Sequence, residues 1–434
     1  MMLNKLLTKY FDTDSSELLS KSISYLIIRV LGTIFTFGFS YYVIKEYSSS
    51  TYGLISLAFS FFLILSVIGR LGLDINIVKH FSINNKSDDC GLFFQSLFFS
   101  FIFTSFLCLI IYWQSDYIVN RIFEKPKPEL LPYLNWVLPS IPFWSITLIS
   151  AHYLRAKKLN NWFVFFNSSS RFLFSLIFIL ILSLLISNDS LIVVKAHLIS
   201  IILLSILSTF IAMVRLKKLT IKSKMKIFYF IKESLPIMYS STTNMFINWI
   251  GIFILGIYTT SQEIGIFEIS VKISLLLTFI SQALNSILAP KIAQKYFEKD
   301  YSGFQSLVRL TTRVNFVSSL VLTFVILIFH RQLLGLFGEE FKDSFILLTI
   351  LCLSQLIGAY CGSVGIILQM TGKQTIYHYL MVFALVILLI AMFVLIPLYG
   401  GNGAAISIFI SMISWNVLGT IYIKRKMNFI SYFR

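Results

Sequence analysis

The sequence predicts an all-α membrane protein with about twelve membrane-spanning helices. Of its 434 residues, 57% are hydrophobic and 13% are charged, whereas about 25% of the residues of an ordinary soluble domain are charged. The hydrophobic residues fall in runs of roughly the 20 residues that one helical span requires. These helices and their short loops use up the chain, so we expect no soluble catalytic domain.

The runs are too long and too uniformly apolar to be barrel strands, which would alternate polar and apolar residues. A helix satisfies its own backbone hydrogen bonds in hydrocarbon. We therefore expect helices to begin near Ile23, Tyr52, Leu92, Tyr133, Trp162, Leu191, Ile237, Ile264, Leu307, Phe341, Ile376 and Gly403.

The basic residues predict the orientation of these spans. The net charge of +17 is carried mostly between the hydrophobic runs, which is typical of topogenic charge and not of a nucleic-acid-binding face. With the N-terminus inside, 25 Lys and Arg residues face the cytoplasm and 6 lie in outer loops. This asymmetry places both termini in the cytoplasm.

Four short sequence similarities between the first and second halves of the chain indicate an internal repeat. Three of them join positions that are 212 to 214 residues apart. Lys79 corresponds to Lys291, and Leu154 corresponds to Leu368. Because each half has six spans, the halves are parallel and related by an axis along the membrane normal.

The repeat predicts three segments of the chain. They are a six-helix half over residues 1–214, a basic cytoplasmic linker over 215–234, and a second six-helix half over 235–434. Two matched bundles of this kind are the architecture of alternating access.

Five basic residues remain inside the predicted spans, where a charge costs about 2.5–3.5 kcal/mol unless it meets water or a partner. They are Arg29, Arg70, Arg171, Lys195 and Lys272.

Arg29 belongs to a polar stripe whose members recur at steps of three or four residues. The stripe runs through Ser22, Tyr25, Arg29, Thr33, Thr36 and Ser40. Snorkelling to the interface is the alternative for Arg29, and the stripe favours a position lining a cavity. Arg171 lies about nine residues into its span, too deep for easy snorkelling, so a functional role is favoured there too.

Glu268 and Lys272 are four residues apart, so they form either a self-neutralising pair or a site where Lys272 meets an anion and Glu268 acts as counter-ion or coupling residue. Arg70 and Lys195 are near helix ends, where snorkelling is the simpler interpretation, although Arg70 remains a candidate for the cationic site.

Other polar residues have structural interpretations. Asn244 and Asn248 are expected to form hydrogen bonds between helices. Pro139 and Pro142 are expected to kink the fourth span. Cys108, Cys352 and Cys361 lie in hydrophobic runs and Cys90 in a short polar loop, without metal or disulfide spacing.

Catalytic and cofactor motifs are absent from the sequence. The five histidines are scattered, and there is no HExxH motif, Walker A motif or Gly-rich phosphate loop. We therefore expect no catalytic residues, no metal, no cofactor and no direct use of ATP.

Several short motifs resemble those of polysaccharide (Wzx-type O-antigen) flippases of the MATE-like MOP superfamily, and the resemblance covers nearly the whole chain. The motifs are Tyr52-Gly53, Gly69–Leu73, Ser234–Ile237, Ile264–Phe267, Pro290, Leu336–Gly338, Thr371–Lys373 and Pro397–Ala404. The chain departs from the family at Leu154–Lys158, where the family more often has a Gln and a Gly.

The resemblance implies a V-shaped helical flippase of the bacterial inner membrane. Such a protein moves an undecaprenyl-diphosphate-linked oligosaccharide from the inner to the outer leaflet. Its partners would be this substrate, the bilayer, and the polysaccharide polymerase and chain-length machinery. It would act as a monomer and bind no nucleic acid. Arg29, Arg171 and Lys272, with Arg70, are the residues expected to contact the diphosphate or acidic sugars.

Two alternatives remain open. A MATE-type multidrug exporter would need acidic residues in its cavity, whereas the spans here are net basic. A polysaccharide polymerase or ligase would need a long outer loop with catalytic Arg or His, whereas the outer loops are short.

Overall fold

The computed structural model describes residues 13–83, 90–185, 189–216, 223 and 225–434. Every regular element in these residues is a helix, which confirms the all-α prediction. The chain divides into two compact units. The N-terminal unit is Ser24–Gln262, and the C-terminal unit is Glu263–Arg434 together with the start of α2 up to Ile23.

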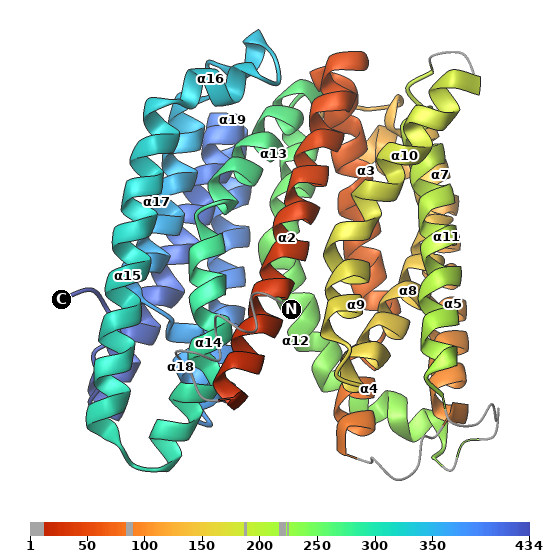
Figure 1. The fold of residues 1–434 in the computed structure, drawn as a ribbon. Coiled ribbons are helices and arrows are strands. Elements are labelled where there is room, and N and C mark those ends of the chain that lie inside the picture. Colours follow the sequence, from red (N-terminus) through yellow and green to blue (C-terminus); the bar gives the residue numbers. More distant parts are fainter. Residues whose placement is uncertain (1–12, 84–89, 186–188, 217–222, 224) are drawn as a thin grey trace. The chain divides into compact units, whose positions relative to one another are not determined.

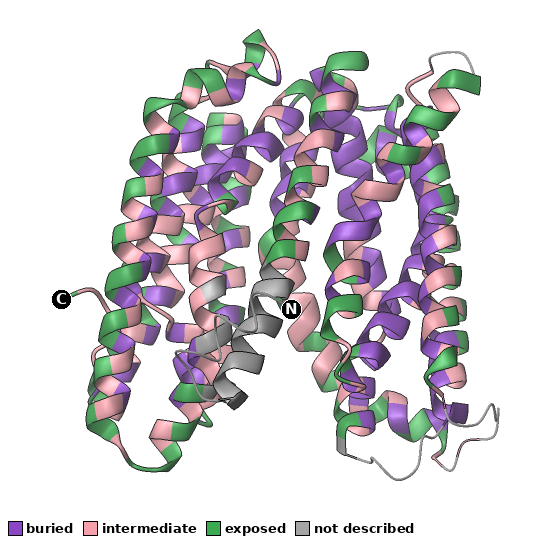
Figure 2. Cartoon of the chain, in the orientation of Figure 1, coloured by how far each residue is buried: buried purple, intermediate pink, exposed green. Residues whose placement is uncertain are grey.

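The N-terminal unit is built around one buried helix. Its elements are α2 (Thr13–Glu46), α3 (Ser49–Gly69), α4 (Leu73–Ile83), α5 (Cys90–Trp113), α6 (Ser115–Tyr117), η1 (Ile118–Ile122), α7 (Leu130–Val137), α8 (Ser140–Ala156), α9 (Asn160–Val164), η2 (Phe165–Ser169), α10 (Ser170–Leu185), α11 (Ile192–Val214) and α12 (Ile227–Tyr258). Helix α3 packs against α5, α7, α8 and α12 and is largely buried (Figure 2). Its buried serines allow the close helix packing that membrane bundles use.

The C-terminal unit contains two broken helices and one very long helix. Its elements are α13 (Ser261–Leu275), α14 (Thr278–Phe297), α15 (Tyr301–Ile328), α16 (His330–Gly335), η3 (Glu339–Phe341), α17 (Phe345–Cys361), α18 (Val364–Met370) and α19 (Gln374–Met427). Helix α19 comprises two helices that meet at Gly400, whose backbone is not helical. Within this unit, α16 lies at the end opposite the α14–α15 turn (Figure 1).

Within the residues that the structure describes, eight helices are long and apolar enough to cross a membrane, or ten when each of two bent pairs is one span. The predicted count of about twelve therefore stays a prediction. One bent pair is α7 and α8, which meet at Pro139 with a bend of 42°. This confirms the kink predicted for the fourth span, since proline removes a helical hydrogen bond.

The structure differs from the sequence prediction at the seventh span. Helix α12 begins at Ile227, so the end of the predicted 215–234 linker is helical, whereas residues 217–222 and 224 lie outside the described chain. Helix α12 packs against α3 and α4, and the boundary between the compact units follows Gln262. The basic residues that continue to Lys232 favour a linker in the sequence, whereas the apolar residues 227–231 already belong to α12. The division into six-helix halves stays a prediction.

The four cysteines are all buried. Cys90 is the first residue of α5, so the prediction of a polar-loop position for it was wrong. Its neighbours Gly91 and Leu92 are buried too, because α5 extends further toward its N-terminus than hydropathy indicated.

Candidate substrate-binding residues

Arg29 lies on α2 and is half-buried. In the predicted polar stripe, the hydroxyls that follow Arg29 in the chain form hydrogen bonds largely within their own helix. Thr33 Oγ1 donates to the Arg29 carbonyl at 3.1 Å, and Thr36 Oγ1 donates to the Gly32 carbonyl at 2.8 Å. Ser40 is buried and lies 3.0 Å from the Tyr52 hydroxyl of α3. The end of the stripe near Ser40 therefore packs against α3, whereas Arg29, Thr33 and Thr36 stay partly accessible, and Arg29 is the charged residue among them. The side chains of Ser22 and Tyr25 lie outside the described residues.

A close helix contact brings the element carrying Arg29 next to the one preceding Arg171. The Ser169 hydroxyl donates to the Ile28 carbonyl at 2.7 Å, and a methyl group on Gly32 would lie within 3.0 Å of the Ser169 α-carbon. Ser169 ends η2, a π-helical segment. Such segments insert one residue into a helix and are frequent at functional sites.

Arg171 is buried among aromatic rings of the N-terminal unit. Its guanidinium carbon lies 4.3 Å from the ring centre of Phe172 and 5.2 Å from those of Phe59 and Phe62. The ring of His197 contacts Phe59 at 4.6 Å and Phe62 at 5.1 Å. A cation over aromatic faces is stabilised by the ring quadrupole, most strongly when desolvated. The sequence predicted that Arg171 lies deep in its span, but it did not predict that aromatic rings surround the guanidinium.

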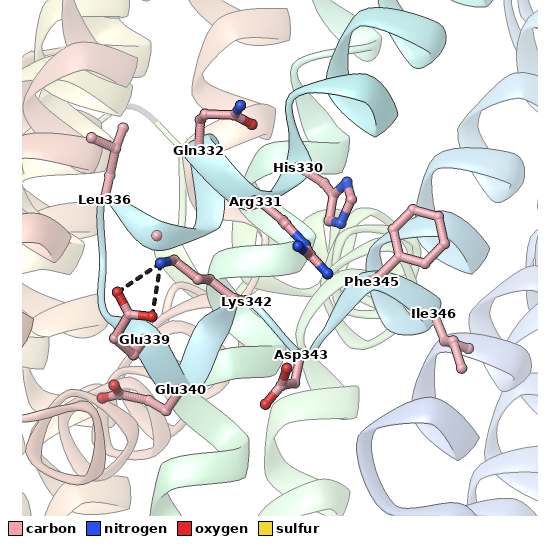
Figure 3. A pocket seen from close by; sticks show the side chains of 11 residues that line it. His330, Arg331, Gln332, Leu336, Glu339, Glu340, Lys342, Asp343, Phe345 and Ile346 are labelled. Carbon is pink, nitrogen blue, oxygen red and sulfur yellow. Dashed lines mark hydrogen bonds and ion pairs between the residues drawn. The ribbon is translucent and has the colours of Figure 1, made fainter.

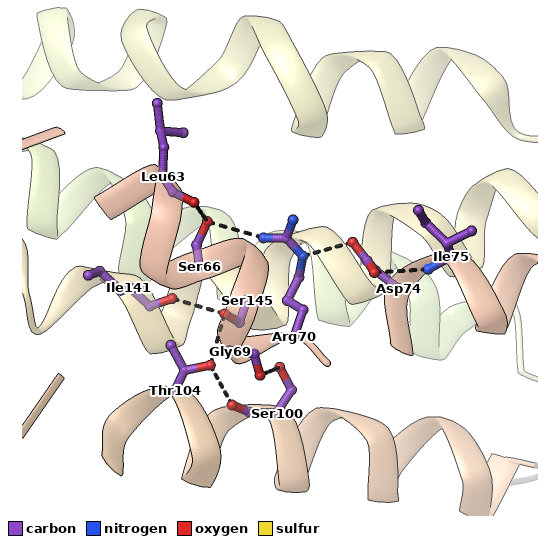
Figure 4. Close-up of polar contacts among 10 residues, drawn as sticks. All are labelled: Leu63, Ser66, Gly69, Arg70, Asp74, Ile75, Ser100, Thr104, Ile141 and Ser145. Carbon is purple, nitrogen blue, oxygen red and sulfur yellow. Dashed lines mark hydrogen bonds and ion pairs between the residues drawn. The ribbon is translucent and has the colours of Figure 1, made fainter. Parts of the chain in front are cut away.

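Arg70 is buried in an ion pair. Its Nε donates to Asp74 Oδ2 at 2.7 Å, and its Nη1 donates to the Ser66 hydroxyl at 3.2 Å (Figure 4). Because Asp74 compensates the charge, the pair adds no net positive charge to a binding surface. A substrate contact by Arg70 stays a prediction.

Glu268 and Lys272 lie on α13 in the C-terminal unit and form an ion pair, with 2.8 Å between Glu268 Oε1 and Lys272 Nζ. Both side chains are nearly buried, at 8% and 13% exposed. The self-neutralising arrangement is therefore present. A contact of Lys272 with an anion, and a coupling role for Glu268, stay predictions.

Helix α12 carries an exposed polar face that the sequence prediction interpreted differently. The amides of Asn244 and Asn248 donate to carbonyls of their own helix, those of Ser240 and Asn244, at 3.2 and 2.7 Å. The expectation of hydrogen bonds between helices was wrong, because both residues are exposed. Polar groups on the surface of a spanning helix persist where they face water, so this face is a candidate lining of a water-filled path.

A broad concavity of about 1450 Å³ lies around α16 and η3. Its lining mixes charges of both signs, and Lys342 Nζ bonds both carboxylate oxygens of Glu339 at 2.6 and 2.7 Å (Figure 3). Glu340 and Asp343 also line it, so acidic side chains accompany the basic ones there.

The described residues include no group of three or more His, Cys, Asp or Glu side chains that could hold a metal ion.

The fold is that of transporters of the MOP superfamily. An inward-facing multidrug resistance MATE family transporter superposes with a TM-score of 0.77 and 16% identity, over 94% of this chain and 98% of that one. The lipid II flippase MurJ in an inward closed conformation gives 0.73 and 16% identity, over 93% and 87%. The chain is thus a multi-pass membrane protein with a transporter fold.

The chain belongs to the polysaccharide biosynthesis protein family, whose sequence pattern matches residues 18–296. The MatE family pattern matches residues 236–395. The chain is 25% identical over 209 residues to the probable low-salt glycan biosynthesis flippase Agl15 of Haloferax volcanii, covering 48% of this chain and 44% of Agl15. It is 25% identical over 179 residues to the capsular polysaccharide biosynthesis protein CapF of Staphylococcus aureus, covering 41% and 45%. Each match thus spans less than half of the relative's length.

Proposed function

We propose that this protein is a flippase that moves an undecaprenyl-diphosphate-linked oligosaccharide from the inner to the outer leaflet of a bacterial cytoplasmic membrane. The observation that carries the proposal is membership of the polysaccharide biosynthesis family over residues 18–296. The match to a glycan biosynthesis flippase and the likeness in fold to a lipid II flippase support it.

The chemistry of the N-terminal unit suits a diphosphate. Arg29 is partly accessible and lies on an element adjoining the one that precedes Arg171. The exposed polar face of α12 suits the sugars, which need water or hydrogen-bonding groups during transfer. Arginine binds phosphate oxygens through paired hydrogen bonds, so Arg29 is the foremost candidate for direct contact.

The cycle follows the predicted repeat. Two six-helix halves, 1–214 and 235–434, alternate their access around the substrate, and both termini stay in the cytoplasm. An inside-negative potential favours outward movement of an anion by about 2.3 kcal/mol per charge per 100 mV. The monomer would hand its substrate to the polymerase and chain-length machinery. The protein performs no catalytic reaction in this proposal.

The test is a pair of substitutions, Arg29→Ala and Arg171→Ala, with Lys342→Ala as the matched control on an exposed ion pair. Surface polysaccharide should fall at least tenfold in both variants, while lipid-linked oligosaccharide accumulates in the inner leaflet. The control should behave as the wild type.

Wild-type levels of surface polysaccharide in the Arg29→Ala and Arg171→Ala strains would contradict the assigned site. The same variants in proteoliposomes, with a labelled lipid-linked oligosaccharide, separate a loss of flipping from a loss of protein.

A multidrug exporter is the second candidate, because the MatE pattern matches residues 236–395. Efflux of a cationic dye by proteoliposomes that do not flip the lipid-linked glycan would favour it. A polymerase or ligase would instead lengthen or transfer the glycan, which chain-length analysis in the same vesicles detects.

A further inference from the structure

The C-terminal unit encloses a polar cavity of about 270 Å³ that none of the proposed substrate-binding residues lines. It lies where the α13–α14 break, α15, the α17–α18 break and α19 meet. The side chains that matter here are those of Asn285, Asn315, Gln355, Gln369, Tyr377 and Trp415.

Both helix breaks border this cavity. Helix α13 ends at Leu275 and α14 begins at Thr278, while α17 and α18 are bent by 42° at a break after Cys361. Leu277 and Thr278 line the cavity from the first break, and Gly362 and Ser363 from the second. Irregular backbone at membrane depth is tolerated only inside protein or beside a water-filled cavity. Broken helices also mark the binding sites of many transporters.

The described lining combines polar and apolar side chains and carries no charge. None of the described residues that form it is Asp, Glu, Lys, Arg or His. Asn315 Oδ1 accepts from the Ser281 hydroxyl at 2.7 Å, and Asn285 Oδ1 accepts from the Ser363 hydroxyl at 2.5 Å. Each of these bonds uses the amide oxygen and leaves two amide N–H donors.

Two further amides line the cavity without a side-chain hydrogen bond to any part of the chain that the structure describes. They belong to Gln355 and Gln369. An amide offers both donors and acceptors, so together the four side chains can bond hydroxyl groups in either direction.

An aromatic pair completes the wall. The rings of Tyr377 and Trp415 lie 6.3 Å apart, nearly perpendicular at 80°. Gly365 allows this arrangement, because even a methyl group there would lie 3.0 Å from the ring of Tyr377. Aromatic faces pack against C–H groups, so the two rings can hold the apolar face of a ligand, while the indole N–H of Trp415 donates to Met412 Sδ at 3.5 Å.

These features exclude several ligand classes. A phosphate or uronate would need a cation, and a cationic drug would need a carboxylate. A drug-sized ligand usually occupies a pocket of more than roughly 300 Å³. A pyranose ring fits the cavity in three respects. Its apolar C–H face suits the aromatic pair, its hydroxyls suit the uncharged amides, and it is small enough for the volume of about 270 Å³.

We propose that this cavity binds one uncharged sugar ring, a neutral hexose or N-acetylhexosamine, of the glycan carried by the lipid. The inference rests on the proposed flippase function, because it names the sugar chemistry that the transported unit presents. It adds recognition of one sugar ring by the C-terminal unit to the diphosphate contacts proposed for Arg29 and Arg171 and to the polar face of α12.

The test uses the purified full chain in lipid nanodiscs and saturation-transfer NMR. The probes are N-acetylglucosamine, N-acetylgalactosamine, glucose and galactose, with glucuronate as the charged comparison. At least one neutral sugar should bind, and glucuronate should bind at least tenfold more weakly. Gln355→Leu and Trp415→Ala should each weaken binding tenfold or more, whereas Trp113→Ala, on an 85% exposed ring of the N-terminal unit, should not.

A second measurement separates this inference from the proposed function. Flipping of a labelled lipid-linked oligosaccharide by the same variants should slow when the labelled glycan contains the sugar that binds. Normal flipping without binding of any neutral sugar would overturn the cavity assignment and leave the flippase proposal intact. Sugar binding that is sensitive to Gln355→Leu, in a protein that flips no glycan, would overturn the flippase proposal and support the cavity. Unchanged thermal melting of the variants establishes that they fold.

Discussion

The three deep arginines of the N-terminal unit have three different environments. Arg70 is neutralised by Asp74 at 2.7 Å, Arg171 is enclosed by phenylalanine rings, and Arg29 is partly accessible. Burying a charge is costly unless it is paired or hydrogen-bonded. A substitution at each site therefore tests a different property, and only Arg29 combines accessibility with a deep position.

Removal of Arg70 should destabilise the protein strongly. Arg70→Met leaves the Asp74 carboxylate buried without its partner, which typically costs about 3–5 kcal/mol in the free energy of unfolding. The double variant Arg70→Met/Asp74→Leu should recover most of this loss. Chemical or thermal unfolding in detergent measures both.

The matched control is Lys79→Met, which breaks an exposed ion pair with Glu233 at 2.9 Å. Such pairs contribute about 0–1 kcal/mol. If Arg70→Met lowered the free energy of unfolding no more than this control does, the buried pair would contribute no more to stability than the exposed one.

At the scale of elements, the break between α17 and α18 depends on one residue, Gly362. Gly362 has φ +79° and ψ −163°, a conformation that is essentially restricted to glycine. A methyl group there would also collide with the Ser431 carbonyl and the Thr312 hydroxyl. The α17–α18 break thus depends on glycine for both its backbone angle and its space.

Gly362→Ala should lower the free energy of unfolding by roughly 3 kcal/mol, from backbone strain plus overpacking. Gly372→Ala is the control, because Gly372 has φ +77° but nothing within 4 Å of an added methyl group. It should cost about 1 kcal/mol. Equal losses in thermal or chemical unfolding would show that the collision at Gly362 is relieved by movement of its neighbours.

The start of α15 is capped by Asp300, outside the spans. Its carboxylate accepts from Lys295 Nζ at 2.7 Å and from the Gly303 backbone N–H at 2.9 Å. The hydrogen bond from Lys295, followed by that from Gly303, lowers the pKa of Asp300 from its usual 3.8 to about 2. Because the folded state favours the ionised carboxylate, its stabilisation is present above the usual pKa and is lost as pH falls toward about 2.

Asp300→Asn should therefore reduce the pH dependence of the unfolding midpoint between pH 3.8 and about 2. The measurement is the difference in unfolding midpoint between wild type and variant across this range, and this difference should shrink as pH falls. A constant difference throughout would mean that Asp300 titrates alike in the folded and unfolded states.

At the scale of the whole molecule, orientation is the property that the basic residues predict. The four native cysteines are buried, so single cysteines introduced in loops report sidedness. Glu340→Cys, near α16, should react with a membrane-impermeant maleimide in intact cells. Lys299→Cys, in the α14–α15 turn, should react only after permeabilisation. The reverse pattern would contradict a cytoplasmic N-terminus.

Much of the fold was predictable from local sequence. The helical class follows from hydropathy, and the 42° bend at Pro139 follows from proline chemistry. The start of α12 at Ile227 was missed because Lys232, Glu233 and Pro236 interrupt its apolar pattern. Asn244 and Asn248 were misinterpreted because their spacing does not reveal whether a face meets another helix or water.

The sequence by itself determined the membrane as solvent and the helical class, and it predicted the depth of the charged residues. These depend on the summed transfer energies of residues close together in the chain. Only the tertiary structure decided which charges are neutralised and where uncharged polar groups meet. The rings of Phe59 and Phe62 around Arg171, and the cavity at the two helix breaks, join residues that are distant in the chain. Ion pairs, cation–π contacts and cavities depend on distances in space, which local patterns do not encode.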